Sequence, residues 1–193
     1  MKSKRFLVTF CLLQTIIVSA QREKNESEKN IHFHSITQAG FLIGSSDVQL
    51  QLATINGIKY KTYFVGAGIG LDYYFERTVP VFIDLRKNIL NRYQSPFVYA
   101  AAGINIPWID KDQENWNREY KKGGYYELGL GYNFPLRKSL AVVLSAGYSV
   151  KLLSAKEYTW NYFLSSSWPP PSAYINHYQY TLRRIGIKAG VSF

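Results

Sequence analysis

Two groups of residues in this sequence have types and spacing that could do chemistry. The first is the glycine series Gly66, Gly68 and Gly70 in the stretch YFVGAGIGLDYY. A dinucleotide-binding loop requires G-x-G-x-x-G between a strand and a helix, and Leu71 stands where the last glycine should be. A spacing of two residues is instead the period of one face of a β-strand. The glycines therefore indicate a strand face without a phosphate ligand.

The second group is the three histidines, His32, His34 and His177, which could serve in acid–base chemistry or metal binding. No metal-ligand spacing connects them. A serine nucleophile needs a histidine that an acid orients, but His34 and Ser35 point to opposite faces of a strand, because neighbours alternate. His177 has Ser172 close in the sequence and no acid beside it. The sequence therefore favours a protein that is not an enzyme and needs neither metal nor cofactor.

Alternation of apolar and polar residues recurs from Ile31 to the last residue and predicts an all-β protein. Asn56-Gly57, the strongest short hairpin signal, predicts the turn between the second and third strands. Two long polar stretches, 107–122 and 152–174, are predicted loops. The eight predicted strands lie near 32–44, 48–55, 63–74, 79–86, 97–106, 125–134, 140–151 and in the last stretch, which ends RIGIKAGVSF.

The chain begins with the layout of a secretory signal peptide. Three cations precede an apolar run, 6–18, that ends in the small-residue sequence Val18-Ser19-Ala20. A run of about 13 residues is too short for a transmembrane helix, which needs roughly 20. We expect residues 1–20 to be cleaved after Sec-type export. Residues 21–30 are charged and contain no apolar group, so they are expected to form a mobile tail before the domain 31–193.

The only cysteine, Cys11, lies inside this apolar run, so the exported chain is expected to use neither disulfides nor thiol chemistry. The formal net charge is +10, but the cations are scattered and match no nucleic-acid-binding module. The sequence therefore argues against a nucleic-acid partner. Anionic lipid headgroups near a cationic rim explain the basic balance better.

Alternation alone does not say which face is inside, since a soluble barrel hides its apolar face and a membrane barrel shows it to lipid. Glycines lie on the polar face, and a small closed barrel has room for little inward side-chain volume. The polar face also carries charges of both signs, which can neutralise one another in a narrow lumen. This predicted lumen charge network consists of Asp72, Asp84, Arg86, Glu127, Lys151, Arg184 and Lys188. The alternative is a periplasmic, lipocalin-like carrier with the faces reversed.

Three stretches carry a resemblance to a known family: TINGIKYKTYFVGAGIGLDYYFERTVPVFIDLR, GGYYELGLGYNF and RIGIKAGVSF. Over about Ile31 to Phe193, the chain resembles the small outer-membrane β-barrel domain proteins of Gram-negative bacteria. The resemblance implies an eight-stranded antiparallel transmembrane β-barrel in the outer membrane, surrounded by lipid and lipopolysaccharide. It also implies that Phe193 is the C-terminal signal that the barrel-assembly machinery reads during biogenesis.

An eight-stranded barrel is filled by its own side chains and leaves no channel of porin size. We therefore expect a plugged lumen, with an internal salt-bridge network favoured over a gated ion path. A structural or surface-interaction role would then fall to the loops 107–122 and 152–174. The alternative is an outer-membrane enzyme that modifies lipid A as a hydrolase or acyltransferase, as some barrels that resemble this one do. Four tryptophans either contact a surface ligand or lie at the membrane interface: Trp108, Trp116, Trp160 and Trp168.

Overall fold

The computed structural model describes residues 31–45, 47–73, 77–92, 94–108, 118–137, 139–159 and 174–193. The predicted signal peptide and charged tail lie outside these residues. The segment Ile31–Phe193 forms one compact unit. No helix in the described part of the chain is long and apolar enough to cross a membrane.

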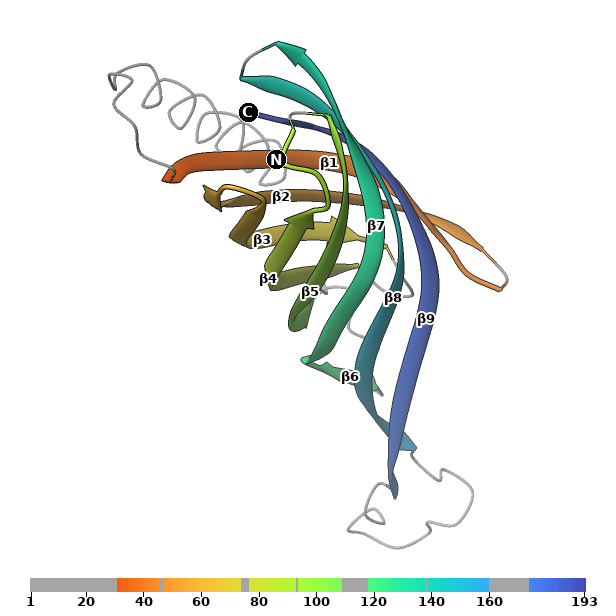
Figure 1. The fold of residues 1–193 in the computed structure, drawn as a ribbon. Coiled ribbons are helices and arrows are strands. Elements are labelled where there is room, and N and C mark those ends of the chain that lie inside the picture. Colours follow the sequence, from red (N-terminus) through yellow and green to blue (C-terminus); the bar gives the residue numbers. More distant parts are fainter. Residues whose placement is uncertain are drawn as a thin grey trace, which may run out of the picture. The chain divides into compact units, whose positions relative to one another are not determined.

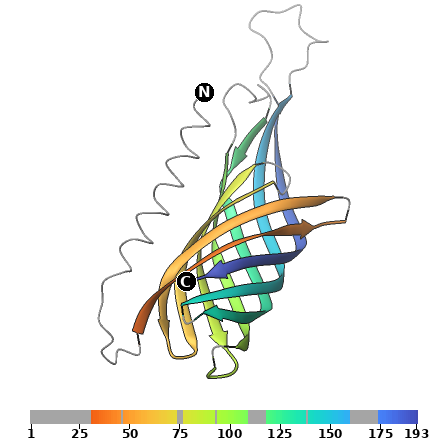
Figure 2. The same cartoon turned by 90° about the horizontal axis from the view of Figure 1, so that it is seen from above.

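The described residues form a single antiparallel sheet that closes into a barrel (Figures 1 and 2). Neighbouring long strands pair in chain order, and the last strand pairs with the first, from Ile36 opposite Ser192 to Ile43 opposite Ile185. The eight-stranded, all-β architecture predicted from the alternation is thereby confirmed. The strands are β1 (Ile31–Ile43), β2 (Val48–Tyr60), β3 (Tyr63–Asp72), β4 (Thr78–Asn88), β5 (Ser95–Pro107), β6 (Arg118–Lys121), β7 (Gly123–Arg137), β8 (Leu140–Thr159) and β9 (Tyr174–Ser192).

The predicted assignment of the two faces is also confirmed. On β3, Val65 and Ile69 are exposed, whereas Gly68 and Gly70 are buried. Large apolar side chains cover the outer wall, and charged side chains lie inside. The lipocalin-like alternative required the apolar side chains to line the interior, so the structure contradicts it.

The dipeptide Asn56-Gly57 does not form the predicted turn. β2 runs through it to Tyr60, and the chain turns at Lys61, which has a left-handed φ of 52°. A Cβ added to Gly57 would overlap the carbonyl oxygen of Val65 on β3, so this glycine permits a close approach of two strands. The local turn preference of Asn-Gly was outweighed by the ladder of backbone hydrogen bonds along the two strands.

Part of each predicted loop is strand. β8 continues to Thr159 and stays paired with β9 as far as Tyr174, so the predicted loop 152–174 is too long. β6, which the sequence analysis placed in the loop 107–122, pairs with β8 from Arg118 opposite Glu157 to Lys121 opposite Ser154. Paired backbones satisfy their own hydrogen bonds, so these strands continue through stretches that lack a regular apolar pattern. Residues 109–117 and 160–173 lie outside the described residues.

Gly66 and Gly68 make room for aromatic rings inside the barrel. A Cβ added to Gly68 would lie 2.5 Å from two ring carbons of Phe82, which is buried on the neighbouring strand β4. Any larger residue at this position would have to displace the ring or the strand. The spacing that resembled a phosphate-binding loop is thus explained by packing.

We expect Gly68→Val to lower the free energy of unfolding by about 1–3 kcal/mol, because the added side chain overpacks the interior against Phe82. Urea-induced unfolding in detergent micelles measures this effect. The matched control is Ala67→Val on the same strand, where the side chain points outward. Equal destabilisation by the two variants would contradict the packing role of Gly68.

Candidate functional site

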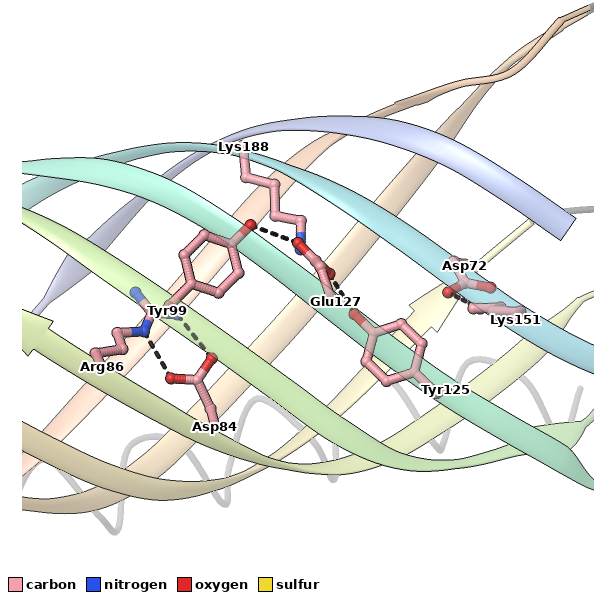
Figure 3. Close-up of polar contacts among 8 residues, drawn as sticks. All are labelled: Asp72, Asp84, Arg86, Tyr99, Tyr125, Glu127, Lys151 and Lys188. Carbon is pink, nitrogen blue, oxygen red and sulfur yellow. Dashed lines mark hydrogen bonds and ion pairs between the residues drawn. The ribbon is translucent and has the colours of Figure 1, made fainter.

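The candidate site is the barrel interior, where the structure places all seven residues of the predicted lumen charge network. Each of these seven residues is at most 8% exposed. They come from five strands, β3, β4, β7, β8 and β9, whose inward faces alternate with the apolar outer wall. Figure 3 shows six of them together with two tyrosines that take part in the same contacts.

Glu127 on β7 is the centre of the largest cluster (Figure 3). Its carboxylate accepts hydrogen bonds from the Lys188 ammonium at 2.5 and 2.6 Å. It also accepts one from the Tyr99 hydroxyl at 2.5 Å and one from the Tyr125 hydroxyl. Three donors from β5, β7 and β9 therefore hold one buried carboxylate, which satisfies a charge that would be costly to bury alone.

Arg86 and Asp84 form a second pair two residues apart on the inward face of β4. The Arg86 Nε lies 2.7 Å from Asp84 Oδ1, and Nη2 lies 3.3 Å from Oδ2. The guanidinium carbon lies 5.3 Å from the ring centroid of Phe97 and 5.5 Å from that of Tyr99. Cations are attracted to aromatic faces at this range. Through Tyr99, this pair is linked to the Glu127 cluster.

A third pair crosses the lumen. Lys151 on β8 forms an ion pair with Asp72 on β3, and both also contact the Thr78 hydroxyl. In the closed ring of eight long strands, β3 and β8 lie four strands apart in either direction, which places them on opposite walls. The Lys151 ammonium lies 5.5 Å from the ring centroid of Tyr125, so this pair adjoins the Glu127 cluster.

The fourth base, Arg184, reaches an acid at the end of the barrel. Its Nη1 lies 2.7 Å from Oδ1 of Asp47, which is in the connection between β1 and β2. The hydrogen bond from Arg184, with a second from Gln49, lowers the pKa of the Asp47 carboxyl. With Asp47 included, four acids face four bases, so the formal charge of the set is zero.

Sequence reasoning missed Asp47, Thr78 and Tyr125 as partners of the lumen charges. Tyr125 had a usable signal, because it lies two residues before Glu127 and therefore on the same face of the strand. Asp47 had none, since a residue in a turn has no strand periodicity. The sequence could not predict the pairings between strands that are far apart in the chain, because these pairings depend on the register of the closed barrel.

The histidines do not form a catalytic arrangement in the described part of the chain. The His34 ring packs edge-on against Phe64, with ring centroids 5.6 Å apart, and its centroid lies 6.4 Å from that of His32. His177 is exposed on β9, opposite Lys156 of β8, and Ser172 lies outside the described residues. Among the residues described, no group of three or more histidines, cysteines and acids could hold a metal ion.

Two further predicted residues, Trp108 and Phe193, lie near the ends of the barrel. Trp108 follows β5, is 44% exposed, and donates its backbone N–H to the carbonyl of Arg77 at 2.8 Å. Phe193 exchanges two backbone hydrogen bonds with Ser35, at 2.7 and 2.9 Å, and so extends the seam between β9 and β1. The other three tryptophans, Trp116, Trp160 and Trp168, fall outside the described residues.

We expect Glu127→Gln to lower the free energy of unfolding by about 3–5 kcal/mol, because it leaves the buried Lys188 ammonium without its counter-charge. Urea-induced unfolding in micelles measures the change. The double variant Glu127→Gln/Lys188→Met should regain part of the loss, since it removes the uncompensated charge. Arg92→Gln, at an exposed turn position, should stay within about 0.5 kcal/mol of the wild type. A Glu127 variant as stable as the Arg92 variant would refute the stabilising role of the cluster.

Comparisons with known proteins show the fold. No family model matches the chain, and no curated protein matches it. Among solved structures, the chain is similar to the solid-state NMR structure of outer membrane protein AlkL in DMPC lipid bilayers. The TM-score is 0.54, the sequence identity is 10%, and the similarity covers 90% of this chain and 94% of that chain. The chain thus has the fold of a small outer-membrane β-barrel protein.

Proposed function

We propose that the protein is an integral outer-membrane β-barrel with a plugged lumen and a structural or surface-interaction role. The observation that carries the proposal is the inverted distribution of side chains. Leu128 and Leu130 on β7 are 66% and 64% exposed, whereas Glu127 on the same strand is buried. An apolar surface that surrounds a closed barrel is unfavourable in water and is the surface that lipid requires.

Aromatic side chains paired with cations support this placement. Near the β2–β3 turn, the Lys61 ammonium lies 5.3 Å from the Tyr60 ring centroid, and the Lys87 ammonium lies 5.3 Å from that of Tyr63. At the opposite end, the Arg77 guanidinium carbon lies 5.8 Å from the Tyr73 ring centroid. Aromatic rings of this kind collect at the two membrane–water interfaces, where cations meet the headgroups.

The ion pair between Asp72 and Lys151 supports a closed lumen, because it joins opposite walls of the barrel. The Glu127 cluster and the pair of Asp84 with Arg86 fill further inward positions on β4, β5, β7 and β9. An eight-stranded barrel has an interior just wide enough for its side chains. The favoured role of these charges is therefore an internal plug that stabilises the barrel.

The two ends of the barrel differ in the length of their connections. All three connections at the end that holds the β2–β3 turn are short, and transmembrane barrels place their short turns in the periplasm. The long connections, which contain 109–117 and 160–173, would then face the cell exterior, and Trp108 would lie beside them. A ligand at the surface would be sought there, in an envelope of lipid and lipopolysaccharide. Phe193 is proposed as the residue that the barrel-assembly machinery reads after Sec-type export.

We expect the protein recovered from outer membranes to migrate differently in electrophoresis when heated and unheated, because a closed membrane barrel resists detergent until it is boiled. Membrane fractionation of the expressing cells provides the localisation. Recovery from the periplasm as a soluble protein, without a heat-dependent shift, would contradict the proposal.

In planar lipid bilayers, we expect the wild type and Arg86→Gln to conduct almost no ions, while Arg86→Gln lowers the stability of the barrel. Removing Arg86 leaves Asp84 without its partner but leaves the cross-lumen pair of Asp72 and Lys151 in place. Single-channel recording and urea unfolding give the two readouts on the same preparation. A conducting variant of unchanged stability would instead indicate a gated ion path.

A further inference from the structure

The outer wall carries an apolar depression of about 680 Å³ across β3, β4, β5 and β7. Its volume falls in the range of ligand pockets, roughly 300–1,000 Å³. One row of outward side chains crosses it, since Val65 pairs with Leu85, Leu85 with Ala100, and Ala100 with Leu128. Ala100 is the small member of this row, between Leu85 and Leu128, and all three line the depression.

The next row, one step nearer the β2–β3 turn, adds a charge. Tyr63 pairs with Lys87, Lys87 with Val98, and Val98 with Leu130, and all four line the depression. Lys87 is exposed, and its ammonium lies over the Tyr63 ring. The following residue, Asn88, donates its backbone N–H to Thr62 in the turn. One end of this apolar depression thus has a cation beside the β2–β3 turn.

The three strand connections at the same end of the barrel are basic. These connections, 59–63, 87–95 and 136–140, contain no aspartate or glutamate. They contain six cations: Lys59, Lys61, Lys87, Arg92, Arg137 and Lys138. At the opposite end, acids such as Asp47 and Glu157 are interspersed. A headgroup that approaches Lys87 therefore meets a field that favours negative charge.

We propose that the depression binds one anionic phospholipid from the leaflet at the turn end of the barrel. An acyl chain lies against Ala100 between Leu85 and Leu128, and the phosphate lies at the Lys87 ammonium. The apolar volume accounts for the acyl chain, and Lys87 beside the basic connections accounts for the preference for an anionic headgroup. This inference rests on the proposed function, because it requires the outer wall to face lipid.

The test uses the full-length barrel in vesicles that contain equal amounts of phosphatidylglycerol and phosphatidylethanolamine. Native mass spectrometry after release into detergent should detect one retained phosphatidylglycerol in preference to phosphatidylethanolamine. We expect Lys87→Gln to lower this retention about fivefold, the factor for one lysine at an anionic lipid surface. Ala100→Phe should lower it as well, because the new ring fills the depression.

Two matched controls separate the site from the rest of the wall. Arg137→Gln removes a rim cation that does not line the depression. Ala102→Phe adds the same ring on the same strand, at an exposed position between Ile83 and Tyr126. Ala102→Phe should retain phosphatidylglycerol as the wild type does, and Arg137→Gln should lower the retention less than Lys87→Gln does.

Three outcomes would overturn the inference: equal retention of the two phospholipids, equal losses in the controls, or preferential retention of lipid A when it is added to the vesicles. A heat-dependent electrophoretic shift of each variant shows independently that the barrel has formed. A barrel that inserts but shows no lipid preference refutes this site alone. A protein that never inserts refutes the proposed function too.

Discussion

The pairing of β9 with β1 is the interaction on which the rest of the structure depends. Without it, Ile36–Ile43 and Ile185–Ser192 would be two open edges with unpaired backbone groups. In a hydrocarbon environment, such groups cost several kcal/mol each, so only a closed sheet is tolerated. Closure also defines an inside and an outside, and every other property of the molecule follows from that distinction.

Inside the barrel, the volume available for side chains is limited. Glycines lie next to aromatic rings and leave room for them. Gly68 lies under Phe82, and a Cβ on Gly129 would similarly approach the Tyr99 ring. The space released is taken by ionised side chains and the hydroxyls that bind them. These charges are tolerated because each acid lies next to a base, and the pair of Asp72 with Lys151 ties opposite walls together. The cost of dehydrating the charges is thus offset by contacts that only a closed barrel can make.

Outside, the same use of small residues has a different effect. Ala100 lies between two leucines in a depression of a wall that carries many large apolar side chains. Lys87 lies one row away, at the end of the barrel where the three strand connections contain no acid. The outer wall is therefore not uniform, and its chemistry changes from the middle of the barrel to the end that holds the β2–β3 turn.

The amino-acid sequence by itself determined the fold class, the face of each long strand and the set of charges in the lumen, because a two-residue period is a local property that needs no partner. The three-dimensional structure alone decided the turn at Lys61 in place of Asn56-Gly57, the extension of β8 to Thr159 and the partner of each charge. Those features depend on register between strands that are far apart in the chain. Asp72 and Lys151 are 79 residues apart and meet only because the ring closes.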